Sequence, residues 1–100
     1  MHFVVHALDK PDAEGHRLAN IDAHRAYLQT APSKHDLTIL LSGPLKTDDN
    51  SRMIGSFFLL DAKNRASVEA MFADDPLVKA DVWQQSVTTV VEIRTNTLLA

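Results

Sequence analysis

Cysteine is absent from the 100 residues of the chain, and glycine occurs at 3 positions only. Without cysteine, the chain can form no disulfide bond, thiolate metal site or cysteine nucleophile. The glycines, Gly15, Gly43 and Gly55, are too far apart for a glycine-rich phosphate loop, and no Gly-x-Ser-x-Gly motif occurs. The sequence therefore argues against nucleotide binding and against acyl transfer by a serine nucleophile.

An excess of positive charge is also absent. The 10 Lys and Arg residues are outnumbered by 13 Asp and Glu residues, which gives a net charge of −3 at pH 7. Proteins that bind nucleic acids carry clustered positive charge, so we expect no nucleic-acid partner. The apolar stretch near the amino terminus, HFVVHAL, is too short for a signal peptide or a membrane span. We therefore expect a cytoplasmic protein that does not enter a membrane.

The histidines do not form a metal-binding motif. His2 and His6 are four residues apart, but they fall in a predicted strand, where this spacing places both on one face. Neither His16 nor His35 extends this pair, and no third ligand accompanies it. We therefore expect no metal site.

Aromatic residues number only 6, although 45% of the residues are apolar and 23% are charged. This composition is typical of a globular domain, and the length predicts one domain over residues 1–100. A small core with few aromatic side chains leaves little stability to spare. Burial against a second copy of the chain would add to it.

The pattern of apolar residues predicts four strands and two helices. The predicted strands cover residues 2–8, 37–44, 53–61 and 86–94, and the predicted helices cover residues 14–31 and 62–74. Proline sets several boundaries, because Pro32 ends the first helix and Gly43-Pro44 ends the second strand. Pro76 starts a short helical turn within residues 76–83, and residues 95–100 form a tail.

The order β-α-β-β-α-β is typical of the ferredoxin-like arrangement, an α+β fold in which two helices cover one face of a four-stranded antiparallel sheet. The first and third predicted strands carry apolar residues on both faces. The face without helices therefore also needs a cover. A homodimer that packs sheet against sheet would supply it.

His24 is the histidine best placed for chemistry. On the predicted first helix it lies one turn from Ile21 and Leu28, at the edge of an apolar stripe that also contains Leu18. Imidazole is the side chain best suited to move protons near neutral pH. A border histidine without a function is the other interpretation, and the pattern leaves both open.

Two acids, Asp74 and Asp75, stand directly before Pro76. An aspartate in this position is a common helix N-cap, which explains one of the two carboxylates. The other is free to approach His24, because the two helices of this fold run side by side, and a carboxylate beside an imidazole fixes its tautomer. In the second predicted strand, Ser42 and Gly43 have two open interpretations, ligand contact or plain strand end.

Four stretches together resemble the YCII-related (YciI-like) family. They are FVVHALDKPDA, AHRAYL, LLSGPL and DDPLVKADVW, and the resemblance extends from about residue 2 to residue 94. It implies a ferredoxin-like fold that dimerises into an α+β barrel, with a pocket that contains a histidine and an aspartate. By position these are His24 and Asp75, while Asp74 caps or lies in solvent. Ser42, Gly43 and Pro44 would contact the substrate.

The resemblance also implies an activity, because one branch of the family removes chloride from chlorinated hydroquinones. We expect a small-molecule enzyme in which His24 and Asp75 perform general acid/base catalysis without a cofactor. Its reaction would be that of a lyase or isomerase on a small cyclic or aromatic-derived substrate. The alternative is a non-catalytic dimeric module that binds a small ligand or a partner protein.

Overall fold

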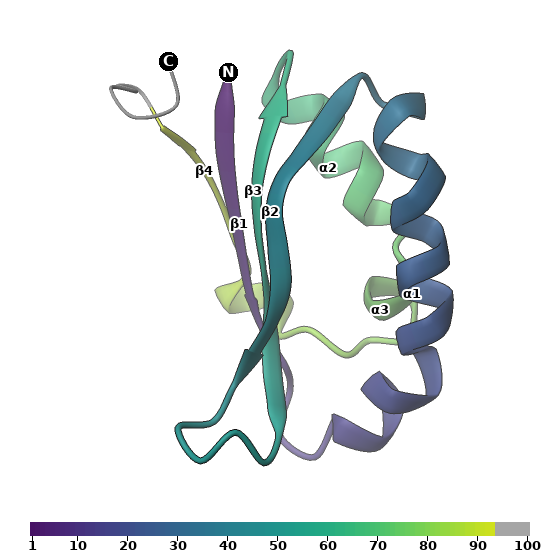
Figure 1. Cartoon of the computed structure of the whole chain (residues 1–100), viewed down its shortest axis with the longest axis vertical. Coiled ribbons are helices and arrows are strands. Elements are labelled where there is room, and N and C mark those ends of the chain that lie inside the picture. The colour runs from purple at the N-terminus through teal and green to yellow at the C-terminus, as the bar shows by residue number, and fades with distance from the viewer. Residues whose placement is uncertain (94–100) are drawn as a thin grey trace.

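The structure, a computed structural model, describes residues 1–93 of the chain. The elements follow one another as β1 (His2–Leu8), α1 (Glu14–Lys34), β2 (Leu37–Lys46), β3 (Met53–Ala62), α2 (Arg65–Ala73), α3 (Pro76–Lys79), the 3₁₀ turn η1 (Gln85–Val87) and β4 (Thr89–Ile93) (Figure 1). No helix in this part of the chain has the length and apolar character needed to cross a membrane.

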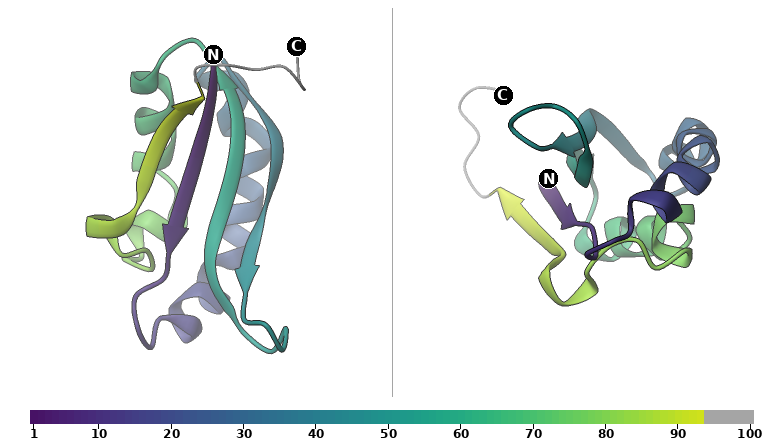
Figure 2. Two further views of the ribbon diagram at one scale, coloured as in Figure 1. Left: turned by 90° about the vertical axis from the view of Figure 1, so that its left-hand side faces the viewer. Right: turned by 90° about the horizontal axis from the view of Figure 1, so that it is seen from below.

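The strands form one antiparallel sheet in the order β2-β3-β1-β4. The helices α1, α2 and α3 lie on the same face of this sheet (Figure 1). In the view that faces the strands, α1 passes behind β3 and β2, while α2 and α3 lie behind β1 and β4 (Figure 2). The predicted ferredoxin-like α+β fold is therefore confirmed.

The core lies between the sheet and the helices. Alternate residues of β1 point into it, namely Phe3, Val5 and Ala7, each at most 1% exposed. An aromatic cluster joins the two layers, because the ring of Phe58 on β3 meets those of Phe72 and Trp83 with centroids 4.8 and 6.2 Å apart. Burial of each such ring stabilises the fold by roughly 1.5–3 kcal/mol.

The opposite face of the sheet has no helix over it among the described residues, yet it is largely apolar. Val4 pairs with Leu59 on one side and with Val91 on the other, and Leu59 pairs in turn with Leu41. Leu41 and Val91 are 60% and 52% exposed. The expectation that both faces of the sheet are apolar is thus correct.

Two prolines do not end the elements that we expected them to end. Strand β2 continues past Pro44 to Lys46, because β2 is an edge strand and can tolerate a residue without an N–H. Helix α1 continues past Pro32 to Lys34, where the N–H of His35 donates to the carbonyl of Ala31 (3.2 Å) and closes the last turn.

Three other boundaries also differ from prediction. Ala62 belongs to β3, and α2 begins only at Arg65, because the side chain of Asn64 accepts a hydrogen bond from Ser67 N and caps the helix. The last strand begins at Thr89 instead of residue 86, since residues 85–87 form the turn η1. The predicted end of this strand at residue 94 and the tail at 95–100 lie outside the described residues.

The buried side of α1 matches the predicted apolar stripe only in part, since Leu28 packs against the core but Leu18 does not. Leu18 is 55% exposed, whereas Arg17, His24 and Ala31 are buried. These three positions are seven residues apart, close to two full turns, and so share one face of the helix. Two of the three buried side chains of α1 are therefore polar, while Tyr27 and Leu28 pack half-buried against the core.

Candidate functional site

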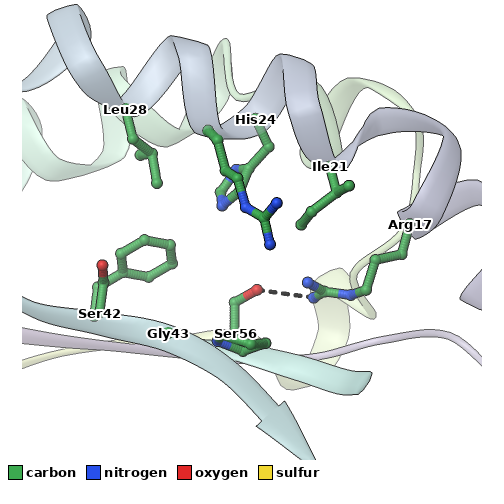
Figure 3. Close-up of a pocket in the computed structure, with 10 residues that line it drawn as sticks. Arg17, Ile21, His24, Leu28, Ser42, Gly43 and Ser56 are labelled. Carbon is green, nitrogen blue, oxygen red and sulfur yellow. Dashed lines mark hydrogen bonds between the residues drawn. The ribbon is translucent and has the colours of Figure 1, made fainter. Parts of the chain in front are cut away.

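A cleft of about 240 Å³ lies between α1 and the two strands beneath it (Figure 3). Helix α1 provides one wall, and β2 and β3 provide the other. The lining residues are Arg17, Ile21, His24, Arg25, Leu28, Ser42, Gly43, Pro44, Ser56 and Phe58. The cleft is smaller than the pockets that hold drug-sized ligands, which measure about 300–1,000 Å³.

His24 and Asp75 meet in this region, although 51 positions separate them in the chain. His24 Nδ1 lies 2.8 and 2.9 Å from the two carboxylate oxygens of Asp75. A carboxylate only accepts hydrogen bonds, so Nδ1 carries a proton, and in the neutral imidazole Nε2 keeps its lone pair. The ring of Phe58 packs against the imidazole edge to face, with centroids 6.1 Å apart, and further restricts it.

Asp75 serves two elements at once. Its Oδ1 also accepts a hydrogen bond from Leu77 N (2.9 Å), which makes it the N-cap of α3. The residue is fully buried and lies behind His24, outside the residues that line the cleft. We expected Asp74 to cap or to lie in solvent and Asp75 to face the pocket; instead Asp75 makes both the cap and the His24 contact. Asp74 is exposed, with its carboxylate 3.8 Å from Lys79 Nζ.

The other imidazole nitrogen, Nε2 of His24, makes no hydrogen bond within residues 1–93. Trp83 Nε1 is the one fully buried side-chain nitrogen or oxygen in this part of the chain that lacks a partner. Nε2 is therefore accessible, and because His24 lines the cleft and is only 6% exposed, the access is through the cleft. A neutral imidazole held in this way can accept a proton at Nε2.

A second polar pair, seven residues earlier on α1, borders the same cleft. Arg17 donates from Nε to Asp9 Oδ2 (2.6 Å) and from Nη2 to Asp9 Oδ1 (2.8 Å), so the guanidinium is held at two points. Nη2 also donates to the hydroxyl of Ser56 (2.8 Å), the contact drawn in Figure 3. Arg17 and Ser56 are 1% and 2% exposed.

The rest of the cleft combines apolar walls with one further cation. Ile21, Leu28 and Phe58 supply the apolar contacts. Arg25 also lines the cleft. Its Nη1 is 3.9 Å from Asp22 Oδ1, and both side chains are exposed to solvent. Such exposed pairs are worth about 0–1 kcal/mol, so the guanidinium of Arg25 remains available to an anionic group.

The three residues expected to contact a substrate, Ser42, Gly43 and Pro44, all border the cleft. Ser42 pairs with Phe58 and Pro44 with Ser56, so their side chains share the helix-facing side of the sheet. Gly43 pairs with Phe57 on the other face, and a Cβ on Gly43 would meet nothing within 4 Å. Gly43 therefore contributes backbone only, and no close approach requires a glycine here.

Sequence reasoning missed Arg17, Arg25 and Ser56 as cleft residues. Arg17 had a detectable signal, since it precedes His24 by two helical turns and follows an acid at the end of the first predicted strand. Ser56 had none, because a serine in an apolar strand does not reveal its partner.

Tyr27 connects the site to α2, because its hydroxyl donates to the carbonyl of Met71. Burial raises the pKa of Tyr27 above its ordinary value of 10.0, and the negative charges of Asp74 and Asp75 raise it further. Within residues 1–93, no three His, Asp or Glu side chains lie close enough together to hold a metal ion.

The fold and the cleft define an α+β protein of the ferredoxin-like class with a buried His–Asp pair beneath its first helix. Within that class the chain belongs to the YCII-related family, whose domain model matches residues 1–94. The resemblance found in the sequence is therefore confirmed.

The solved structures that are similar to this chain include two that bear on its fold and function. One is the 5-chloro-2-hydroxyhydroquinone dehydrochlorinase TftG from Burkholderia phenoliruptrix AC1100, in complex with 2,5-dihydroxybenzoquinone; it is 27% identical with a TM-score of 0.80, and the match covers 96% of each chain. The other is an antibiotic biosynthesis monooxygenase, 14% identical with a TM-score of 0.56 over 96% of this chain and 98% of the other, which supports the fold alone. No curated protein sequence matches the chain.

Proposed function

We propose that the chain is a small-molecule enzyme in which Nε2 of His24 takes a proton from the substrate. The observation that carries this proposal is the His24–Asp75 contact, in which both carboxylate oxygens lie within 2.9 Å of Nδ1. Asp75 acts as a positioning residue, because it holds the imidazole in the tautomer with a basic Nε2 and stabilises the imidazolium that forms. General acid/base catalysis of this kind contributes about 10²–10⁴-fold to a rate.

The reaction is that of a lyase or isomerase on a small cyclic or aromatic-derived substrate. The cleft volume of about 240 Å³ and the apolar side chains of Ile21, Leu28 and Phe58 suit a single ring. Ser42 and the backbone around Gly43 and Pro44 form the opposite wall, where they contact the ring. The similarity to a dehydrochlorinase supports elimination of chloride as the first reaction to test. The scheme uses no cofactor.

The protein acts as a homodimer that packs the open faces of two sheets together. This proposal is supported by the exposure of Leu41 and Val91, 60% and 52%, in a row that crosses the whole sheet. Light scattering should give a mass of twice 11.1 kDa. A Leu41→Glu variant should give the monomer mass, and a monomeric wild type would contradict the dimer.

The catalytic proposal is tested by chloride release from 5-chloro-2-hydroxyhydroquinone. We expect the wild type to release chloride and His24→Asn to do so at least about 10²-fold more slowly. His16→Asn is the matched control, since His16 is an exposed histidine of the same helix that does not line the cleft. An unchanged rate in His24→Asn would refute the role of Nε2. Binding of 2,5-dihydroxybenzoquinone by the wild type without chloride release would favour the alternative, a non-catalytic ligand-binding module.

A further inference from the structure

We propose that Ser56 Oγ and Arg17 Nη1 together form a binding site for a substrate oxygen that becomes negatively charged when His24 takes the proton. This inference rests on the proposed function and adds to it the kind of group that the substrate must present. Ser56 lies on the sheet wall of the cleft and His24 on the helix wall (Figure 3). A substrate between them would touch both.

The orientation of Arg17 is fixed on the side away from the cleft. Two of its nitrogens, Nε and Nη2, donate to the two carboxylate oxygens of Asp9, and this two-point contact holds the plane of the guanidinium. Asp9 is itself anchored at the end of β1, where its N–H donates to Ile54 O (2.8 Å) and its carbonyl accepts from Gln84 Nε2 (3.0 Å). The donors are therefore in place before a ligand arrives.

This arrangement turns Ser56 into a hydrogen-bond donor toward the cleft. A guanidinium can only donate, so the Ser56 hydroxyl must accept from Arg17 Nη2 (2.8 Å). The hydroxyl proton then needs an acceptor, and residues 1–93 provide none. Because Ser56 is 2% exposed and lines the cleft, an acceptor can reach it only from there.

Arg17 supplies a second donor at the same place. Its Nη1 has no partner within the described residues, yet it is not among the fully buried atoms that lack one. Since Arg17 is only 1% exposed and lines the cleft, Nη1 is also accessible through the cleft. Two N–H or O–H donors directed at one position stabilise developing negative charge on oxygen, because they require no rearrangement as the charge forms.

The charges around this site favour a substrate oxygen that is neutral before the reaction over one that is already an anion. Asp9 balances the charge of Arg17 at 2.6 Å, so the donors attract an oxygen through their dipoles more than through net charge. The remaining cation of the cleft is Arg25, which is 66% exposed and therefore acts on the entering ligand with weak, salt-screened attraction.

The substrate class follows from these positions. It is a small ring in which a carbonyl or hydroxyl oxygen is conjugated with the atom that loses its proton. His24 Nε2 takes that proton, and the electron pair of the broken C–H or O–H bond moves through the ring onto the oxygen at Ser56. In an elimination the pair then returns to form a π bond and expels the leaving group as an anion. The proton on His24 and the anion pass to water, so charge and atoms balance.

The test uses 2,5-dihydroxybenzoquinone as the probe and calorimetry as the first readout. We expect Ser56→Ala to weaken its binding about ten- to hundredfold, the range for a lost hydrogen bond to a charged oxygen. Ser67→Ala is the matched control, because Ser67 is also buried, at 8% exposure, but lies on α2 outside the cleft. This control should bind like the wild type.

A second readout separates binding of an oxygen anion from a general effect on the cleft. The visible absorbance of the bound probe reports the pKa of its hydroxyl groups, which donors at the oxygen lower. We expect this pKa to rise in Ser56→Ala and to stay at the wild-type value in Ser67→Ala. A Ser56→Ala variant with unchanged affinity and unchanged probe pKa would overturn the inference, as would a wild type that does not bind the probe.

These outcomes are distinct from failure of the proposed function. His24→Asn removes the proton acceptor but leaves the donors of Arg17 and Ser56, so it should slow turnover and retain most of the probe affinity. If Ser56→Ala behaves like the wild type while His24→Asn loses turnover, the oxygen site is wrong and the proton transfer stands. If both variants keep full turnover, the proposed function itself fails.

Discussion

Helix α1 places two polar pairs on its buried side, and they differ in what they leave unused. In the Arg17–Asp9 pair, both carboxylate oxygens accept from the guanidinium. In the His24–Asp75 pair, both carboxylate oxygens lie within 2.9 Å of Nδ1. The other imidazole nitrogen, Nε2, has no partner within residues 1–93. The first pair therefore fixes a donor toward the cleft, Nη1 of Arg17, and the second fixes an acceptor, Nε2 of His24.

The comparison shows that burial of an ionisable group does not by itself mark a catalytic group. Arg17 and Asp75 are both at most 1% exposed. What distinguishes His24 is an accessible atom with a lone pair, fixed by a partner on the other side of the ring. The two pairs can be separated by experiment, because loss of Asp75 should act mainly on turnover, whereas loss of Arg17 should also lower the free energy of unfolding.

The largest effect is expected from Asp75→Asn, on turnover. The amide oxygen can still accept from Leu77 N, whereas the amide NH₂ donates to His24 Nδ1 and moves the imidazole proton to Nε2. We expect kcat to fall about 10²–10⁴-fold, while the free energy of unfolding falls by at most about 2 kcal/mol. Chloride release and urea unfolding measure the two quantities.

The control for this variant is Asp74→Asn, which removes the neighbouring exposed carboxylate. We expect both turnover and stability to stay near the wild-type values. If Asp74→Asn lost activity and Asp75→Asn kept it, the assignment of the positioning acid would be wrong.

The next effect concerns stability and the other pair. Arg17→Met leaves Asp9 buried without its cation, which typically costs about 3–5 kcal/mol. Urea unfolding followed by the fluorescence of Trp83, the single tryptophan, measures this loss. The double variant Arg17→Met with Asp9→Leu should regain most of it, because no charge is then left unpaired. A double variant as unstable as Arg17→Met would show that packing, not charge, makes the difference.

A smaller effect reports on the charge of the acids next to the site. Tyr27 is the only tyrosine, so phenolate absorbance measures its pKa without interference. We expect this pKa to lie above 10.0 and to decrease in Asp74→Asn, since the charge of Asp74 raises it. Because the folded protein disfavours the phenolate, stability from this group is present below pH 10 and is lost as the pH rises through the folded-state pKa. No change in Asp74→Asn would contradict this cause.

The smallest effect belongs to an exposed carboxylate that contrasts with both buried pairs. Asp49 Oδ1 accepts hydrogen bonds from Thr47 Oγ1, Ser51 Oγ and Ser51 N at the tip of the β2–β3 hairpin. These bonds lower its pKa from 3.8 to about 2. The depressed pKa means that its contribution is present above pH 4 and is lost as the pH falls toward 2. Carboxylate signals in NMR measure this pKa, and Thr47→Val should raise it without affecting the cleft.

The fold was largely predictable because it depends on periodicity. Alternating residues in β1 and the order of the elements sufficed for the ferredoxin-like arrangement. The boundaries at Pro32 and Pro44 were not predictable, because the tolerance of proline depends on where an element lies: the last turn of a helix and the edge of a sheet both accept it.

The site was predictable only in part. The position of Asp75 before Pro76 marked it as a cap, and the resemblance to the family suggested His24 as its partner. One carboxylate can make both contacts only because α3 packs against α1. No local sequence pattern encodes this packing. The cluster of Asp9, Arg17 and Ser56 combines residues from three separate parts of the chain, and charged residues on the core side of α1 contradict the usual apolar stripe.

The spacing of Arg17, His24 and Ala31 also limits how the chain can change in length. Insertion or deletion of one residue between positions 17 and 24 would rotate the rest of the helix by about 100° and separate at least one pair from its partner. The hairpin tip around Asp49 is exposed and lies outside the helix that carries this spacing. Additional residues there should therefore cost little stability. Length variation among relatives should therefore concentrate in the hairpin and be absent from the middle of α1.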